Sequence, residues 1–115
     1  MRVRLVSVVL AVSLLIGASA ASASAATIVR GRASRWHPAI VRISKGQSVR
    51  WKSVDTHHTV ASYGTNWTYF KHLRKGTITP PRKFRRKGIY RFYCLVHGSV
   101  NNGKCTGMCG KVVVG

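Results

Sequence analysis

The stretch "GIYRFYCLVHGSVNNGKCTGMCGKVVV" (residues 88–114) decides the fold of this 115-residue chain. Its first part alternates apolar and polar side chains, Asn101-Asn102-Gly103 in its middle is a strong turn signal, and its end is rich in valine. It also holds all three cysteines of the chain and the only methionine besides Met1. The stretch therefore predicts two strands joined by a turn, with side chains along them that can bind a metal through sulfur or nitrogen.

The sequence before this stretch also predicts short strands. Alternation is clear in ATIVR (26–30), AIVRIS (39–44) and SVRWKSV (48–54), and TITPPRKF (77–84) is typical of a strand edge broken by prolines. The segment NWTYFKHLRKG (66–76) lacks period-two order, and we expect a loop or a short helical turn there. Regularly spaced strands with glycine turns predict an all-β sandwich or barrel.

Residues 1–25 look like a secretory signal peptide, with a basic start, an apolar run and a tail of small residues. We expect cleavage after Ala25, with Ala20 and Ala23 as alternatives. A membrane-anchored helix is the competing interpretation, but a span needs about 20 apolar residues and this run gives way early to Ala and Ser. We therefore expect residues 26–115 to form one soluble, monomeric, exported domain without a membrane span, in the periplasm, in the cell envelope or outside the cell.

The chain has 20 Lys and Arg residues against one acidic residue, Asp55, and a formal net charge of +19. The cations concentrate in RGRASR (30–35) and RKFRRK (82–87), which alone would indicate a nucleic-acid-binding patch. The export signal argues against nucleic acid as a physiological partner. Anionic cell-envelope polymers and an acidic protein are the partners we expect. With no paired carboxylates and a single Asp, the sequence does not indicate an enzyme.

Strand parity predicts where the metal-binding side chains point. If Val60 faces the core, His58 does too, whereas His57 and Thr59 face outward. His57 replaces His58 if the strand is bulged there. His37 and His72 fit no motif and are expected on the surface.

The same argument applies to residues 88–114. Cys94 faces inward because the opposite face of its strand carries Arg91. Met108 is in phase with the final valines, and His97 is expected in a turn just after Cys94. Two imidazoles, a thiolate and a thioether suit a redox copper with two His and one Cys in a plane and a weak axial Met.

At this point the sequence resembles a known family. The segments 37–60, 88–97 and 108–114 are similar to the plastocyanin-like cupredoxins, which are small blue copper proteins. The resemblance covers most of residues 26–115 and implies a Greek-key β-sandwich or barrel of the cupredoxin type. It further implies one type 1 copper ion, bound by four side chains: His58, Cys94, His97 and Met108.

The sequence departs from the family between the second histidine and the methionine. The residues GSVNNGKCTG (98–107) intervene, and they predict a small hairpin or loop. Cys105 and Cys109 are then near enough to pair, and we hypothesise a disulfide that braces the axial-ligand loop. The alternative is a zinc or Cu(I) site made by the three cysteines and His97, which leaves His58 unexplained.

The resemblance implies transfer of single electrons between protein partners through Cu(I) and Cu(II), with an acidic docking surface on the redox partner. In this family the second histidine is the solvent-facing port, which here is His97. Two other functions stay open from the sequence. One is a cell-envelope copper-binding protein or metallochaperone, and the other is a basic secreted module that binds anionic polymers.

Overall fold

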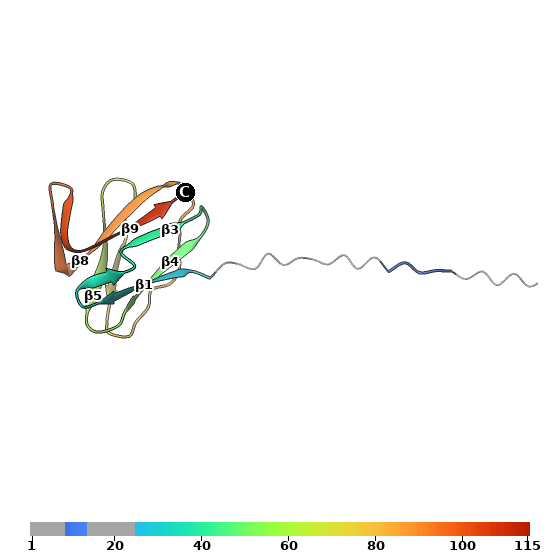
Figure 1. Ribbon diagram of the computed structural model, residues 1–115, viewed down its shortest axis with the longest axis horizontal. Coiled ribbons are helices and arrows are strands. Elements are labelled where there is room, and N and C mark those ends of the chain that lie inside the picture. Colours follow the sequence, from blue (N-terminus) through green and yellow to red (C-terminus); the bar gives the residue numbers. More distant parts are fainter. Residues whose placement is uncertain (1–8, 14–24) are drawn as a thin grey trace, which may run out of the picture.

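The computed structural model describes residues 9–13 and 25–115. From residue 25 onward the chain folds into two sheets (Figure 1). Every regular element in the described residues is a strand: β1 (Thr27–Arg32), β2 (Arg35–His37), β3 (Ile40–Ile43), β4 (Ser48–Ser53), β5 (His58–Tyr63), β6 (Phe70–Leu73), β7 (Arg82–Lys83), β8 (Gly88–Asn101) and β9 (Lys104–Val114). The prediction of an all-β sandwich is confirmed.

The first sheet has four strands in the order β2-β1-β4-β7, and the second has five in the order β3-β9-β8-β5-β6. The pairs β1–β4 and β3–β9 are parallel, whereas β8 pairs antiparallel with β5 and β9. Strands β5, β8 and β9 are therefore neighbours, although about 40 residues separate β5 from β9 in the sequence.

Alternating side chains of the two sheets meet in one core. β4 contributes Val49 and Trp51, and β8 contributes Phe92, all fully buried. The rings of Trp51 and Phe92 contact edge to face, with centroids 5.3 Å apart. Trp51 belongs to the first sheet and Phe92 to the second, so this contact joins the two sheets. Such a pair adds to the free energy gained by burying apolar surface. The three tryptophans, Trp36, Trp51 and Trp67, are buried packing residues.

The expectation for residues 66–76 is wrong in part. Phe70–Leu73 forms β6, an edge strand paired with β5. Of its four residues only Leu73 is buried. An edge strand that packs a single residue into the core needs no apolar alternation, which is why the sequence of this segment lacks period-two order. The preceding residues form a loop that carries Trp67 into the core.

The β8–β9 hairpin reaches beyond the sandwich (orange to red in Figure 1). Its turn is made by Asn102 and Gly103, whose φ angles are 50° and 75°. Two consecutive positive φ angles favour Asn-Gly and suit the twist of a tight hairpin. The turn predicted at Asn101-Asn102-Gly103 is therefore confirmed, and the residues after Cys94 extend β8 instead of ending it.

Most of the predicted signal peptide, residues 1–25, lies outside the described residues. Among those that the structure describes, no helix has the length and apolar character needed to cross a membrane.

Candidate metal centre

Three donor side chains meet at one end of the second sheet. His58 is the first residue of β5, while Cys94 and His97 lie in β8 where its register against β9 shifts, between Tyr93 and Gly98. The irregularity replaces the turn that was expected around His97. It brings Cys94 and His97 to the same side, which regular alternation would not do for residues three apart.

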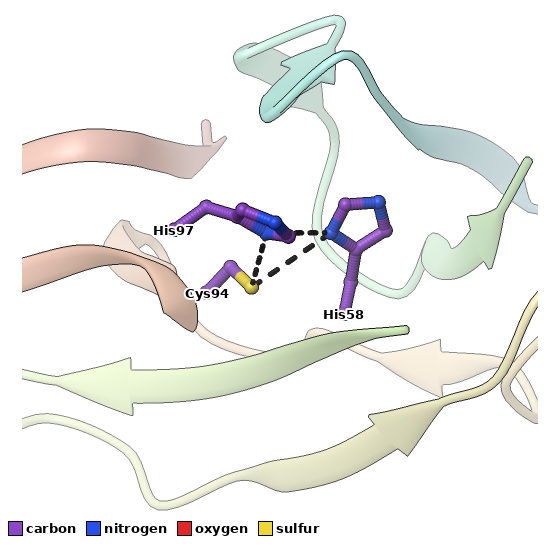
Figure 2. Close-up of side chains that lie close together, drawn as sticks. All are labelled: His58, Cys94 and His97. Atoms are coloured by element: carbon purple, nitrogen blue, oxygen red, sulfur yellow. Dashed lines mark hydrogen bonds between the residues drawn. The ribbon is translucent and has the colours of Figure 1, made fainter. Parts of the chain in front are cut away.

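Figure 2 shows the two imidazole rings and the thiol pointing toward one another. The Nδ1 atoms of His58 and His97 are 3.2 Å apart, and Cys94 Sγ lies 3.9 Å from the first and 3.6 Å from the second. A triangle with these sides has its circumcentre about 2.1 Å from each corner, close to the metal–nitrogen and metal–sulfur bond lengths of about 2.0 to 2.3 Å. The triangle therefore has the right size for one metal ion.

The three donors differ in exposure. His58 and Cys94 are fully buried, whereas His97 is half-buried. The inward orientation that strand parity predicted for His58 and Cys94 is thus confirmed, and His57 is exposed. Among the described residues this is the one group of three or more His, Cys or carboxylate side chains close enough to hold a metal ion.

Met108 lies in β9 and is also fully buried, as parity predicted. A Cβ on Gly31 would lie 3.0 Å from His58 Cδ2 and 3.1 Å from Met108 Cε. The thioether and the imidazole therefore approach β1 at the same point, and a glycine there leaves room for both. This places Met108 beside the triangle without making it a corner.

Asp55 orients His58 from outside the triangle. Its Oδ1 lies 2.8 Å from His58 Nε2, and its Oδ2 accepts a hydrogen bond from the backbone N–H of Ala33 at 2.7 Å. That N–H, together with the His58 contact, lowers the pKa of Asp55 to about 2. Because the carboxylate is ionised at neutral pH, it holds the proton of His58 on Nε2 and leaves Nδ1 free to bind a metal.

Thr59, the residue after His58 in β5, also contacts the sulfur of Cys94. Its backbone N–H donates to Cys94 Sγ at 3.4 Å, and its hydroxyl lies 3.9 Å from the same atom. The hydroxyl oxygen also accepts a hydrogen bond from Leu95 N–H at 2.8 Å. Donors aimed at a thiolate stabilise its negative charge, and they couple the position of β5 to the segment that carries Cys94 and His97.

No protein-family model and no curated protein matches the sequence. Solved structures do match the fold. Amicyanin from Paracoccus versutus shares 20% identity over 80% of this chain and 83% of its own, with a TM-score of 0.63. A purple cupredoxin from Nitrosopumilus maritimus shares 18% over 77% of this chain and 99% of its own, with a TM-score of 0.61.

The chain has the cupredoxin fold. The same fold forms part of a copper-containing nitrite reductase from Thermus scotoductus, which shares 16% identity over 79% of this chain and 22% of its own, with a TM-score of 0.65. The fold by itself therefore does not separate electron carriers from enzymes.

Within this cupredoxin fold, the donor set decides which metal the site suits. Two imidazole nitrogens and one thiolate in a triangle, with a thioether nearby, match the chemistry of a blue copper site. The cluster of His58, Cys94 and His97 supports one type 1 copper ion.

The other two cysteines form a disulfide, Cys105–Cys109, with a sulfur–sulfur distance of 2.01 Å. Cys94 is the free cysteine. The alternative zinc or Cu(I) site would need three reduced cysteines, and only Cys94 has a free thiol. The disulfide joins two positions of β9 that flank Met108 in the sequence, and Gly107, between them, approaches the His97 carbonyl so closely that a Cβ would overlap it.

Asp55 and Thr59 were not found from the sequence. Parity assigned both to the outward face, yet Thr59 is buried, because Cys94 and Leu95 of β8 contact it. Asp55 is exposed in the turn before β5, where no periodic pattern applies. The one available signal was composition, since a chain with a single acidic residue keeps it three positions before the inward histidine.

Proposed function

We propose that this protein is an exported type 1 copper protein that carries single electrons between redox partners. One observation carries the proposal. Two Nδ1 atoms and one Sγ atom, from strands far apart in the sequence, converge on a point at bonding distance from all three. A site held between rigid strands keeps its geometry when copper changes oxidation state, which lowers the cost of moving an electron.

His58, Cys94 and His97 are the proposed equatorial ligands, and Met108 is the proposed weak axial ligand. The disulfide between Cys105 and Cys109 is proposed to fix β9 on both sides of Met108. Once bound, copper would supply the redox couple, while the protein supplies the ligands, the carboxylate that orients His58 and the donors around the sulfur. We propose a carrier and not an enzyme, because among the described residues the proposed copper ligands are the one group of side chains able to hold a metal ion.

His97 is the proposed electron port, because its ring is less buried than the other donors. Leu95 and Val96, in the same segment of β8, are exposed at 51% and 58%. An apolar rim around a half-buried imidazole suits brief, close contact with a redox partner. The excess of Lys and Arg supports a partner with an acidic docking surface.

The test is addition of Cu(II) to the reduced apoprotein. We expect an intense charge-transfer band in the red part of the visible spectrum, absent in Cys94→Ser. Cys105→Ser combined with Cys109→Ser is the matched control and should keep the band, because those sulfurs lie outside the triangle. A wild-type protein without the band would refute type 1 copper.

A second measurement separates an electron carrier from a metallochaperone. Copper held by four ligands between two sheets should leave slowly when a strong chelator is added, and rapid loss would favour a protein that passes the metal on. Export is tested by the N-terminus of the secreted protein, which we expect at Ala26.

A further inference from the structure

A second site-like feature lies in the loops next to the start of β8. Here a cleft of about 430 Å³ is lined by four cationic side chains from one short segment of chain: Arg82, Lys83, Arg85 and Arg86. The segment comprises β7 and the connection to β8. A cleft with four positive charges attracts anions, because a concave surface focuses the field of the charges that line it.

The cleft is distant from the metal centre. β8 begins at Gly88, which pairs with Val114 next to the C-terminus, and Cys94 comes six residues later. At about 3.3 Å per strand residue, the start of β8 is about 20 Å from Cys94 along the strand, and Tyr90, the β8 residue that lines the cleft, is about 13 Å from it. The cleft therefore belongs to neither the proposed copper site nor the electron port.

No acidic side chain of the protein neutralises these cations. The chain has a single acidic residue, Asp55, and its carboxylate contacts Ala33 and His58 at the metal centre. One of the four, Arg82, lies over the ring of Phe84, with 5.7 Å from its guanidinium carbon to the ring centroid. Four like charges within five residues repel one another, so a bound anion would stabilise the folded state.

The walls of the cleft are fixed by hydrogen bonds that do not use the cationic groups. The Tyr90 hydroxyl donates to the backbone carbonyl of Arg86 at 2.8 Å, and the Asn66 side-chain amide donates to Ile89 O at the same distance. Phe84 N–H donates to Gln47 O at 2.9 Å. The cations are thus held on an ordered segment before any ligand arrives, which lowers the entropy cost of binding.

The floor of the cleft indicates what kind of anion fits. It is formed by the rings of Trp67, Phe84 and Tyr90, each at least nine-tenths buried. Rings buried to this extent expose too little surface for a nucleobase to stack on, and stacking is what single-stranded nucleic acids use in sequence-tolerant sites. The ligand is therefore recognised through its charges. Three of the four cations are arginines, whose planar guanidinium groups match phosphate oxygens in pairs.

We propose that this cleft binds a polymer that carries phosphate groups in series. One phosphate group would engage one or two guanidinium groups and leave the others uncompensated, whereas consecutive phosphates can engage the whole row. The ligand would hold the protein at this cleft and leave the half-buried His97 and its apolar rim free.

The test measures binding of inorganic polyphosphate to the full chain loaded with copper, at 150 mM salt, by titration calorimetry. The variant is Arg85→Gln with Arg86→Gln. Its matched control is Arg42→Gln with Arg74→Gln, which removes the same charge from exposed positions outside the cleft. We expect the cleft variant to lose affinity at least about tenfold and the control less than about twofold, since charge-assisted Arg–phosphate contacts are local.

Three results would overturn the proposal. Equal losses in the two variants would mean that only net charge matters. Equal affinity for polyphosphate and polyglutamate would remove the preference for phosphate. An oligonucleotide that binds more tightly than polyphosphate would assign the cleft to nucleic acid. None of these results bears on the copper proposal, because the visible band of each variant is recorded in the same samples.

Discussion

At the scale of single residues, the Asp55 carboxylate fixes the orientation of the His58 ring and the position of its proton. We predict that Asp55→Asn weakens copper binding about 10- to 100-fold, the usual effect of removing a carboxylate partner from a ligating histidine. The amide can still contact Nε2, but it lacks the charge that favours a proton there. Competition with a chelator of known affinity measures the change.

His57→Gln is the control for this variant. His57 is adjacent to His58 in sequence, is exposed, and has its Nε2 atom 3.4 Å from His72 Nδ1, away from the triangle. Its replacement should leave copper affinity unchanged. Equal affinities for Asp55→Asn and the wild type would show that Asp55 only supports the turn at Ala33.

Thr59 is predicted to set the reduction potential. Thr59→Val keeps the shape of the side chain and the backbone N–H to Cys94, but it removes the hydroxyl near the sulfur. Loss of a donor near the thiolate favours Cu(II), so the potential should fall, as voltammetry would measure. The Leu95 N–H loses its acceptor, which should lower the free energy of unfolding by about 1 to 3 kcal/mol. A potential at or above the wild-type value would refute this role.

The sequence predicted which side chains face inward but not what holds them. His58, Cys94 and Met108 share a parity with buried neighbours, and that pattern is local in the sequence. The partners of His58 and Cys94 depend on a turn and on strand pairing, which no short window of sequence contains. Thr59 illustrates this, since its burial results from the segment around Leu95, 36 positions away.

At the scale of elements, the β8–β9 hairpin and its disulfide brace the metal centre. Cys105 and Cys109 are four residues apart, so their bond should add only about 2 kcal/mol or less to the free energy of unfolding in the loop-closure model. We predict that replacing both with Ala lowers global stability slightly and increases copper loss to a chelator more clearly. Thermal unfolding of the apoprotein and chelator kinetics of the copper form measure the two effects separately.

Lys104→Gln, at the end of the same hairpin, is the control for that double variant because it changes the hairpin and keeps the disulfide. If the cysteine variant and the control release copper at the wild-type rate, the disulfide does not brace the site.

Strand prediction succeeded where one face of a strand is buried, including the edge strand β3, and failed for the edge strand β6. β4 and the first part of β8 alternate because one side packs against the opposite sheet. β6 buries only Leu73, so its sequence carries almost no periodic signal. The shift in β8 between Tyr93 and Gly98, which positions His97, depends on pairing with β9 and is likewise invisible to alternation.

At the scale of the whole molecule, the positive charge should control encounter with partners. The chain has 20 cations and one acidic side chain, and that acidic side chain is engaged at the metal centre. The potential outside the protein is therefore positive on average, and anionic partners are attracted before contact. Salt shortens the range of this attraction, because the Debye length falls from about 10 Å at 0.1 M to about 3 Å at 1 M.

We predict that the second-order rate of electron exchange with an anionic reagent, such as hexacyanoferrate, falls as ionic strength rises. The rate with a cationic reagent, such as hexaammineruthenium, should rise, because the same screening removes repulsion. Stopped-flow absorbance of the copper band measures both rates.

Because long-range attraction depends on total charge, the variants at Arg85/Arg86 and at Arg42/Arg74 should shift these rates equally, although only the first pair lines the cleft. Rates that ignore salt would refute steering, and unequal shifts would mean that the reagent docks in the cleft instead of near His97.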